Sequence, residues 1–315
     1  MAPGPLAGRS ALITGAGRGL GREYARLLAH LGAHVLVNDL GSAVDGAAGG
    51  EGADLGAAEA VAAEITAAGG RALADRSDVS DWAAAKDLVG LAVDSFGQLD
   101  VLVNNAGILR PRTIVGMTEA EWDDVIRVHL RGTFATTHYA ALHWRERAKA
   151  GRPLDARLID TTSGSGLYGN GQANYAAAKA AIAAMTLIAA DELGRYGATA
   201  NAIAPVARTR MGIGSIPESY SPAAAATLVA WLASPRSAGI TGRVFNVGGG
   251  HVSVVNGWHT GPAADQAQAW TLGELDEVVP GLVAQAAPRP DLLGYYPGEP
   301  RSPHLPTLHY EGPPR

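Results

Sequence analysis

A glycine-rich stretch near the amino terminus, residues 14–21, constrains the fold of this chain more than any other feature. It reads Thr-Gly-Ala-Gly-Arg-Gly-Leu-Gly, follows the short apolar run 11–13 and opens a helical pattern that continues to residue 31. A strand, a glycine turn and a helix in this order place a pyrophosphate on backbone N–H groups at a helix N-terminus. The chain has 41 glycines, so a plain turn is an equally good interpretation of the motif alone.

The composition describes a chain that can bury a large core. Its 315 residues are 47% hydrophobic and 17% charged, which allows one large domain or two small ones. The net charge is −5, and no basic stripe or polybasic run occurs. Neither nucleic acid nor an anionic membrane surface is therefore an expected partner.

The sequence contains no cysteine, which excludes disulfides, thiolate nucleophiles and cysteine-ligated metal sites. Residues 1–9 carry Pro3 and Pro5 and no long apolar region, so no signal peptide is expected there. No run is expected to reach the roughly 18 apolar residues of a membrane-spanning helix. A cytoplasmic protein is the resulting expectation.

Apolar runs and helical patterns alternate over most of the chain. The apolar runs are continuous, as in a parallel sheet that is covered on both faces. They predict seven strands, near residues 11–14, 35–38, 72–75, 101–104, 156–160, 198–204 and 244–247. Helices are predicted over residues 20–31, 57–68, 80–96, 118–150, 172–195 and 223–233. This order predicts one doubly wound α/β domain, a Rossmann fold with a seven-stranded, mostly parallel sheet, over residues 1–250.

The character of the sequence changes at about residue 251. Residues 288–315 contain eight prolines and cannot be regular secondary structure. Residues 251–315 are therefore predicted to be a C-terminal extension that is partly irregular. Its aromatic and apolar residues favour docking on the domain or on a neighbouring subunit over disorder; these are Tyr295, Tyr296, Leu305 and Tyr310.

Polar residues follow the predicted strands and converge on one edge of the sheet. In an open parallel sheet, ligands bind beyond the carboxyl ends of the strands. The polar segments at this edge are 14–21, Asp39, Asp78, 104–107, Ser163 and Pro205. Their convergence is stronger evidence for a dinucleotide site than any single motif.

Asp39 lies at the end of the second predicted strand, 18 residues after Gly21. An acid at this position hydrogen-bonds the ribose hydroxyls of NAD and repels the 2′-phosphate of NADP. The alternative role is a turn cap for the following loop. Arg18 favours the opposite cofactor, since an arginine in the glycine turn could meet a 2′-phosphate. We give Asp39 more weight, because a charge at the ribose edge discriminates directly.

Tyr175 and Lys179 are four residues apart in a predicted helix and therefore share a face. A nearby ammonium favours phenolate and lowers the pKa of a tyrosine, which makes it a usable general acid/base. The spacing alone is common, and an accidental pair is the better interpretation in isolation. Here the pair follows Ser163, whose hydroxyl could hold a carbonyl or carbinol oxygen.

His129 lies within a predicted helix beside apolar Val128 and Leu130, a setting typical of a core histidine. His138 and His143 are nine and fourteen residues further on and do not have ligand spacing. No metal site is expected.

Together these motifs resemble the short-chain dehydrogenase/reductase family. The matching segments occur in the family's order over about 240 residues; they are 14–21, 78–79, 104–107, Ser163, 175–179 and 201–205. Other segments are similar to one branch of the family, the (3R)-hydroxyacyl-CoA dehydrogenase part of peroxisomal multifunctional enzyme type 2, also called 17β-hydroxysteroid dehydrogenase type 4. These segments are 37–41, 105–110, 128–132 and 168–175.

The resemblance implies an oxidoreductase that moves a hydride between NAD(H) and a secondary alcohol or ketone, such as a 3-hydroxyacyl thioester or a steroid-like substrate. It implies Tyr175 as catalytic acid/base, Lys179 as the residue that lowers its pKa and holds the nicotinamide ribose, and Ser163 as the residue that orients the substrate oxygen. The implied cofactor-binding residues are Gly15, Arg18, Gly19, Leu20, Gly21, Asp39, Leu40, Asp78, Val79, Asn105, Ala106, Gly107, Tyr175, Lys179, Pro205 and Val206. A homodimer or homotetramer is also implied, through the helix of Tyr175 and the long helix before it.

The spacing of the catalytic residues departs from the family. Ser163 precedes Tyr175 by 12 residues, where the family usually has thirteen. A one-residue deletion just after Asn170 accounts for the difference. Otherwise Thr162 or Ser165 could take the place of the serine.

Two further departures concern the helix before the site and the substrate lid. His129 replaces the family's usual helix asparagine, a position that works largely through a backbone carbonyl and a relay water. The segment 206–220, where the family builds its lid, is short. Two alternatives stay open: an NADP-dependent ketoreductase of a polyketide-type pathway, and a catalytically silent dinucleotide-binding scaffold. The presence of Ser163, Tyr175 and Lys179 argues against the scaffold.

Overall fold

The computed structural model describes residues 4–47, 52–169, 171–209, 211, 216–288, 290–291 and 293–301. Within these ranges eight strands form one sheet in the order β3-β2-β1-β4-β5-β6-β7-β8. All neighbours are parallel except β7 and β8, so the doubly wound α/β prediction is confirmed. The predicted number of seven strands is wrong, because a short eighth strand folds back on β7.

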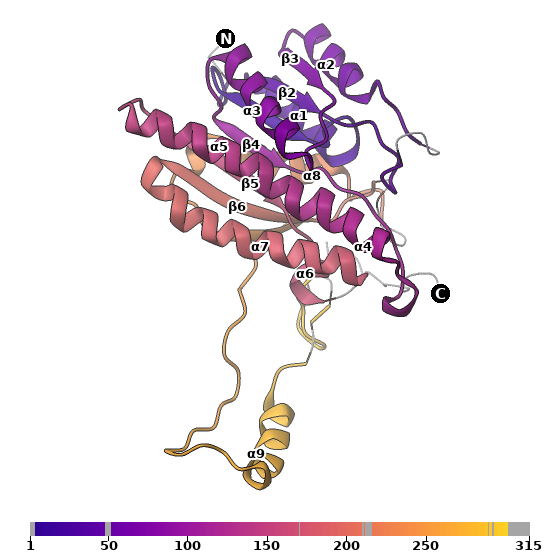
Figure 1. Ribbon diagram of the computed structural model, residues 1–315, viewed down its shortest axis with the longest axis vertical. Coiled ribbons are helices and arrows are strands. Elements are labelled where there is room, and N and C mark those ends of the chain that lie inside the picture. The colour runs from indigo at the N-terminus through magenta and orange to yellow at the C-terminus, as the bar shows by residue number, and fades with distance from the viewer. Residues whose placement is uncertain are drawn as a thin grey trace.

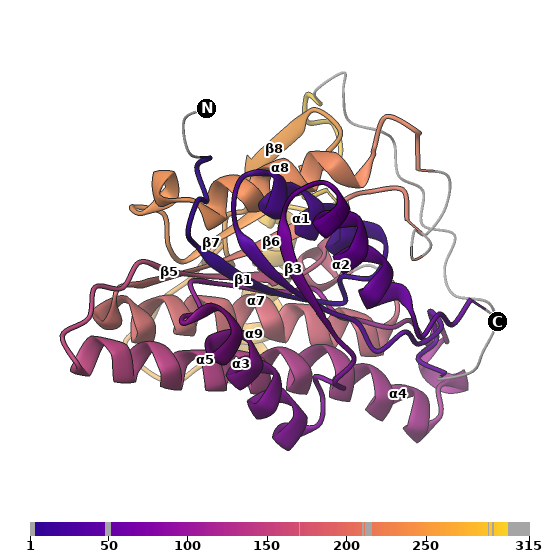
Figure 2. The same ribbon diagram turned by 90° about the horizontal axis from the view of Figure 1, so that it is seen from above.

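The strands are β1 (Ser10–Thr14), β2 (His34–Asn38), β3 (Arg71–Asp75), β4 (Val101–Asn104), β5 (Ala156–Thr161), β6 (Ala198–Pro205), β7 (Arg243–Gly248) and β8 (His251–Val254). One face of the sheet is covered by α1 (Gly19–His30), α2 (Ala57–Ala67) and α8 (Pro222–Ala233), and the other by α3 (Trp82–Phe96), α5 (Gly132–Lys149) and α7 (Ala173–Leu193) (Figure 2). Shorter elements are α4 (Glu119–Ile126), α6 (Gly164–Tyr168) and the 3₁₀ turns Ile114–Gly116, Gly194–Tyr196 and Pro235–Ser237.

The core lies in two layers because both faces of the central strands are apolar. Every residue of β1, β4 and β5 is buried. Alternate residues of these strands contribute to separate clusters on the two faces, for example Ile13 to one and Leu12 to the other. The continuous apolar runs in the sequence therefore reflect strands that are covered twice.

The long helix predicted over residues 118–150 is divided in the structure. Its start is as expected, because Thr118 caps α4 and forms a capping box with Glu121. Between α4 and α5, however, the backbone is π-helical over Arg127–Arg131. Such segments are rare and frequently lie at functional sites, and this one contains His129.

Among the described residues, one helix is long and apolar enough to cross a membrane by length and composition, namely Ala173–Tyr196. The expectation that no such run exists therefore needs correction. It is weak evidence for a membrane protein, because a core helix of a folded domain passes the same test. The helix is 44% buried within its most apolar window and packs on β5 and β6.

Beyond β8 the chain extends away from the body as an arm that carries the helix α9 (Leu272–Gln285) (Figure 1). Neither β8 nor α9 was predicted from the sequence. The chain then returns to the body at Leu293, which is buried. The predicted contacts of Leu305 and Tyr310 fall outside the described residues.

Trp144 provides a test of the layer between α5 and the sheet. It is fully buried, and its indole Nε1 donates a hydrogen bond to the Leu99 carbonyl at 2.7 Å. Trp144→Phe keeps an aromatic ring but leaves that carbonyl without its donor, so we expect the free energy of unfolding in urea to fall by about 1–3 kcal/mol.

The matched control is Trp122→Phe, at a site that is 40% exposed. It should change the free energy of unfolding by less than about 0.5 kcal/mol. Equal losses in the two variants would contradict the role assigned to Trp144.

Candidate active site

A cleft opens at the carboxyl edge of the sheet, beside the point where the strand order reverses between β1 and β4. This is where ligands bind in open α/β sheets. Most of the predicted cofactor residues line it; they are Gly15, Arg18, Gly19, Leu20, Asp39, Leu40, Asp78, Val79, Asn105, Ala106 and Gly107. These predicted residues therefore lie together at one cleft at the carboxyl edge of the sheet.

The glycine turn is tied closely to the loop after β4. The hydroxyl of Thr14 accepts hydrogen bonds from the N–H groups of Asn105 and Ala106, and the Asn105 side chain donates to the carbonyls of Thr14 and Gly15 at 3.1 and 3.0 Å. Gly21 packs on the same turn, since a Cβ there would lie 2.3 Å from the Gly15 carbonyl oxygen. It therefore supports the turn from within α1.

The N-terminus of α1 faces this turn without a capping side chain. The N-cap residue is Arg18, and no side chain hydrogen-bonds the first N–H groups of the helix. Uncapped N–H groups and the positive end of the helix dipole suit a phosphate. The residues present thus fit the pyrophosphate of a dinucleotide.

Asp39 holds the turn from the β2 side. One carboxylate oxygen accepts the Gly17 N–H and the other accepts the Gly41 N–H, both at 2.8 Å. The turn-cap role considered from the sequence is therefore present, and the carboxylate also lines the cleft. Because each oxygen can accept a second hydrogen bond, binding of ribose hydroxyls is compatible with this role.

Arg18 is directed at the loop after β2. Its guanidinium donates to the backbone carbonyls of Ser42 at 2.7 Å and Gly52 at 2.5 Å. These bonds engage two of the donors that a 2′-phosphate would need.

Asp78 forms a polar cluster with Ser80 and Arg127 at the far end of the cleft. It accepts hydrogen bonds from the N–H and hydroxyl of Ser80 at 2.9 and 2.6 Å, and pairs with Arg127 at 3.0 Å. Partial burial raises the pKa of Asp78, but the bonds from Ser80 and Arg127 outweigh it and leave the pKa below its usual value. The sequence did not single out Arg127, which belongs to the π-helical segment and carries no motif.

Ser163 and Tyr175 come together at the end of β5. The Ser163 side chain is near enough to the Tyr175 hydroxyl to lower its pKa, and it also caps α6 by accepting the Ser165 N–H at 3.2 Å. The alternative Thr162 is engaged elsewhere, since its hydroxyl donates to the Lys179 carbonyl at 2.6 Å. Of the three candidates, Ser163 is the one that the structure places beside Tyr175.

Lys179 is buried behind this pair. Its Nζ donates to the Thr161 carbonyl at 2.6 Å and lies 5.7 Å from the centre of the Tyr175 ring. Burial lowers the pKa of Lys179 to about 7, opposed by the charge of Asp160. Asp160 is itself buried, which raises its pKa to about 6 despite hydrogen bonds from Asn104 and Thr186.

The expected effect of Lys179 on Tyr175 is not found in this structure. Burial raises the pKa of Tyr175, and the hydrogen bond from Ser163 offsets this only in part. The prediction of a lowered pKa is therefore wrong for the protein without ligands. The physical reason is that the tyrosine hydroxyl is buried, and the loss of water disfavours the charged phenolate.

His129 is a core residue, as expected, but it contacts the site. Its Nε2 lies 3.0 Å from the Ile108 nitrogen, and the imidazole meets the Tyr175 ring edge-on at 5.2 Å. Burial and the charge of Lys179 lower the pKa of His129 to about 3, so the ring is neutral at physiological pH. Its Nδ1 is buried without a partner among the described atoms.

Asn174 is a further residue that the sequence did not reveal. It is fully buried and donates to the carbonyls of Arg110 and Glu121 at 3.1 and 3.0 Å. Its side-chain oxygen accepts the Tyr175 N–H at 2.7 Å. These hydrogen bonds fix the first turn of α7. In the sequence, the only sign of this role is that Asn174 directly precedes Tyr175.

Pro205 and Val206 lie at the end of β6 and do not line the cleft. The Val206 N–H donates to the Val247 carbonyl at 2.8 Å. Thr209 and Met211, which follow later in the chain, do line the cleft. They belong to the segment 206–220, of which residues 210 and 212–215 fall outside the described ranges.

Comparison with known proteins identifies the class. A family model described as short chain dehydrogenase matches residues 9–214, and the chain belongs to this family. Hydroxyacyl-CoA dehydrogenase ChsB1 of Mycobacterium tuberculosis is 47% identical over 267 residues, which are 81% of each chain. Peroxisomal multifunctional enzyme type 2 of Mus musculus is 42% identical over 250 residues, 78% of this chain but 32% of that protein.

A solved structure agrees with these relationships. The crystal structure of a short chain dehydrogenase from Mycobacterium avium matches with a TM-score of 0.83 and 48% identity, over 93% of this chain and 100% of that one. The relationship to the multifunctional-enzyme branch is thus confirmed. The protein is a hydride-transfer oxidoreductase that acts on CH–OH groups and uses a nicotinamide dinucleotide.

The burial of Lys179 predicts how stability depends on pH. Its pKa is about 7 in the folded protein, below the value of 10.5 in a free chain, so between these values the unfolded chain binds more protons. Stability should therefore rise with pH in this range, by up to about 1.4 kcal/mol per pH unit. Lys179→Met should lose this rise when urea unfolding is compared at several values of pH between about 7.5 and 9.5.

The control is Lys149→Met, at a side chain that is 63% exposed. It should keep the pH dependence of the wild type. Parallel pH profiles for the wild type and Lys179→Met would contradict a buried, titrating Lys179.

Proposed function

We propose that this enzyme catalyses the reversible oxidation of a 3-hydroxyacyl thioester, with NAD as its cofactor. The observation that carries the proposal is the grouping of Ser163, Tyr175 and Lys179 at the carboxyl end of β5, in a sheet whose first strand leads through a glycine turn to a helix N-terminus suited to phosphate. The name of the Mycobacterium tuberculosis relative, a hydroxyacyl-CoA dehydrogenase, supports the substrate class. A steroid-like alcohol is the second substrate type that the same site would accept.

Each catalytic side chain has a proposed task. When bound, the nicotinamide supplies the hydride acceptor or donor. Tyr175 takes the proton of the substrate hydroxyl during oxidation and returns it during reduction. Ser163 hydrogen-bonds the same substrate oxygen and fixes its position. Lys179, with a pKa near neutrality, passes the proton on toward solvent.

The proposal of NAD rests on Asp39. Its carboxylate lines the cleft next to the glycine turn, where it would accept hydrogen bonds from ribose hydroxyls and repel a 2′-phosphate. Two donors of Arg18 are occupied by backbone carbonyls, which weakens its case as a phosphate ligand. We further propose that Pro205 and Val206 contact the nicotinamide end, at the end of β6.

We also propose a catalytic domain over residues 1–250 with an extension over 251–315, and a cytoplasmic location. A homodimer or homotetramer is supported by α7, whose exposed residues over 173–188 form an apolar stripe; they are Ala177, Ala180, Ala184, Leu187 and Ile188. Small residues at helical spacing allow close packing of a second helix. An exposed apolar stripe of this length indicates a protein interface.

The catalytic role of Tyr175 is tested by Tyr175→Phe. Loss of the acid/base should lower turnover by a factor of about 10² to 10⁴. Assays should cover hydroxyacyl-CoA, steroid and aromatic polyketide alcohols with both cofactors, and the highest kcat/KM is expected with hydroxyacyl-CoA and NAD. Excess NAD(H) should still raise the thermal midpoint of the variant, because the cofactor cleft is intact.

Tyr196→Phe, in the 3₁₀ turn that follows α7 and outside the site, is the matched control and should keep its turnover. Unchanged turnover in Tyr175→Phe would refute the mechanism. Absence of stabilisation by NAD(H) in the wild type would instead support a different role for the fold.

Cofactor choice is tested by Asp39→Asn, which keeps one acceptor for the Gly17 N–H and removes the charge. The dissociation constant for NAD should rise about tenfold or more, and the preference for NAD over NADP should shrink, because a charge-assisted hydrogen bond is lost. Thermal midpoints without cofactor report whether the turn is intact. If the wild type binds NADP more tightly than NAD, the alternative of an NADP-dependent ketoreductase holds.

A further inference from the structure

Asp160 is a buried acid in the second half of β5 for which the proposed mechanism has no task. Its side chain is fully buried, and among the described residues Asp100 is the only other buried acid. Removing a carboxylate from water is costly unless other groups compensate for its charge. Within the described part of the chain, none of the hydrogen bonds to Asp160 comes from a cation. A carboxyl in such a place indicates a role beyond packing.

Neutral donors hold the Asp160 carboxyl in one orientation. The Asn104 amide donates to one oxygen at 2.9 Å, and the Thr186 hydroxyl donates to the other at 2.8 Å. Asn104 in turn accepts a hydrogen bond from Thr136 at 2.7 Å and donates one to Thr137 at 3.0 Å. The carboxyl therefore joins β4, β5, α5 and α7 at one buried point.

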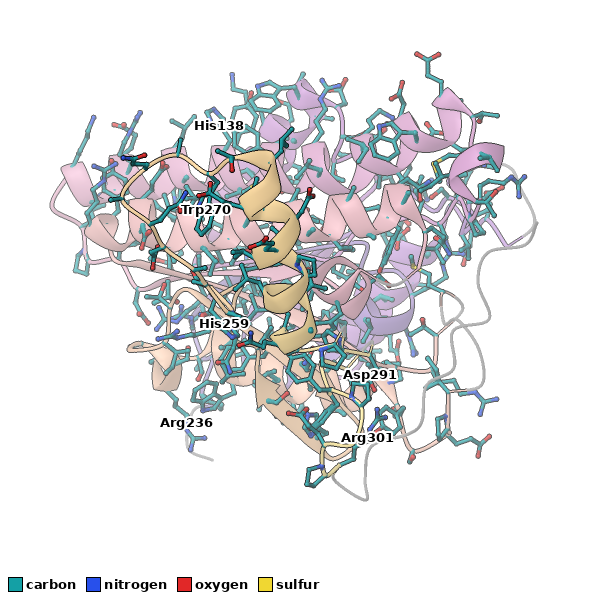
Figure 3. All side chains as sticks on the ribbon, turned by 90° about the horizontal axis from the view of Figure 1, so that it is seen from below. His138, Arg236, His259, Trp270, Asp291 and Arg301 are labelled. Carbon is teal, nitrogen blue, oxygen red and sulfur yellow. The ribbon has the colours of Figure 1, made fainter. Side chains whose placement is uncertain are left out.

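Lys179 lies on the same side of the sheet as this carboxyl. The helices that contribute to the cluster, α5 and α7, run side by side over that face (Figure 1, Figure 3). Lys179 precedes Thr186 on α7 by seven residues, which is two helical turns and therefore the same face of the helix. Its Nζ donates to the carbonyl of Thr161, the residue directly after Asp160. The ammonium and the carboxyl are thus buried on one face, one residue apart along β5.

Other charges contribute little to this region. The elements α6 and β6 contain no charged residue, and His129 of the π-helical segment is neutral. On α4, Glu121 and Asp124 form ion pairs with arginines of the loop before that helix. Asp160 is therefore the acid that compensates for the buried Lys179.

The two groups stabilise each other's charge. Burial lowers the pKa of Lys179 to about 7, and the charge of Asp160 opposes this shift. Burial raises the pKa of Asp160 to about 6, opposed by its hydrogen bonds and by the charge of Lys179. Such mutual effects are strong in a buried region, because the dielectric constant there is low. Without the carboxylate, burial alone would act on Lys179, which would then lose its proton at a lower pH.

We propose that Asp160 is a further positioning residue of the reaction, whose carboxylate keeps Lys179 an ammonium near neutral pH and so sets the pH at which the lysine passes on the proton of Tyr175. This inference rests on the proposed function, in which that proton comes from the substrate hydroxyl. Asp160 is fully buried and does not line the cleft. It therefore acts through Lys179 and does not touch the substrate.

The first test uses Asp160→Asn, which keeps an acceptor for the Asn104 amide and removes the charge. The chain contains three lysines, Lys86, Lys149 and Lys179, so NMR of ¹³Cε-labelled lysine can follow each one separately. The titration midpoint of Lys179 should fall by about one pH unit or more from its wild-type position near 7. The two exposed lysines should not move. An unchanged midpoint for Lys179 overturns the proposal.

The matched control is Asp100→Asn, which removes the other buried acid. Asp100 lies just before β4, at the amino end of the sheet, where it accepts the Ser10 N–H at 2.8 Å. This variant should leave the Lys179 midpoint in place. An equal fall in both variants would assign the effect to loosened packing and would contradict a role for the Asp160 charge.

The link to the reaction is tested by the pH dependence of kcat/KM for alcohol oxidation. Oxidation needs a group that can accept a proton, so the midpoint of its rise with pH should move down in Asp160→Asn by the same amount as the Lys179 titration. A purely structural role would lower the rate at every pH and leave the midpoint in place, which would overturn the proposal. Absence of turnover in the wild type would instead refute the proposed function, and the NMR titration would still report on the charge of Lys179.

A thermal-stability cycle at pH 7 covers the case in which Asp160→Asn folds poorly. In the Lys179→Met background the carboxylate has no compensating cation, so adding Asp160→Asn should raise the thermal midpoint by about 2 °C or more. In the wild-type background the same substitution should lower it. Equal shifts in the two backgrounds would show that the groups do not interact and would overturn the proposal.

Discussion

The burial of the Lys179 ammonium is the constraint on which the rest of the active site depends. A cation can be buried only where fixed oxygen atoms compensate for lost water, and the end of β5 supplies them through the Thr161 carbonyl and Asp160. The helix α6 closes over it at Gly166, where a Cβ would lie 2.4 Å from the Ala180 nitrogen and 2.7 Å from the Lys179 carbonyl carbon. β5, α6 and α7 therefore pack together around Lys179. This packing positions Ser163 at the end of β5 and Tyr175 on α7.

Much of the fold could be predicted because the sequence repeats one physical pattern. Continuous apolar runs mark strands that are buried on both faces, and they located seven of the eight strands. The eighth, β8, escaped because its burial alternates and its apolar residues Val252 and Val254 face outward. The π-helical segment of residues 127–131 was not predicted, because one extra residue in a single turn hardly changes the helical periodicity of the sequence. The helix α9 was hidden by its glycines and Pro280, although Thr271 and Glu274 form a capping box at its start.

The candidate site was predictable to the extent that its residues belong to motifs with fixed spacing. Gly15 and residues 18–20 of the glycine turn, Asp39 and the segment 105–107 line the cleft. What sequence could not show was which hydrogen bonds each side chain already makes. Asp39 is both a turn cap and a cleft residue, and the burial of Tyr175 raises its pKa, against the expected shift. Arg127 and Asn174 act through contacts with distant segments, which a single sequence does not reveal.

The central claim is that a hydride passes directly between a substrate carbinol carbon and a nicotinamide at the Tyr175 site. The most direct measurement follows a 3-hydroxyacyl-CoA with deuterium on the carbinol carbon, incubated with the enzyme and NAD. The account predicts that mass spectrometry finds the deuterium in the reduced cofactor, in amounts equal to the ketone formed. Deuterium released into water, or ketone formed without labelled cofactor, would contradict it.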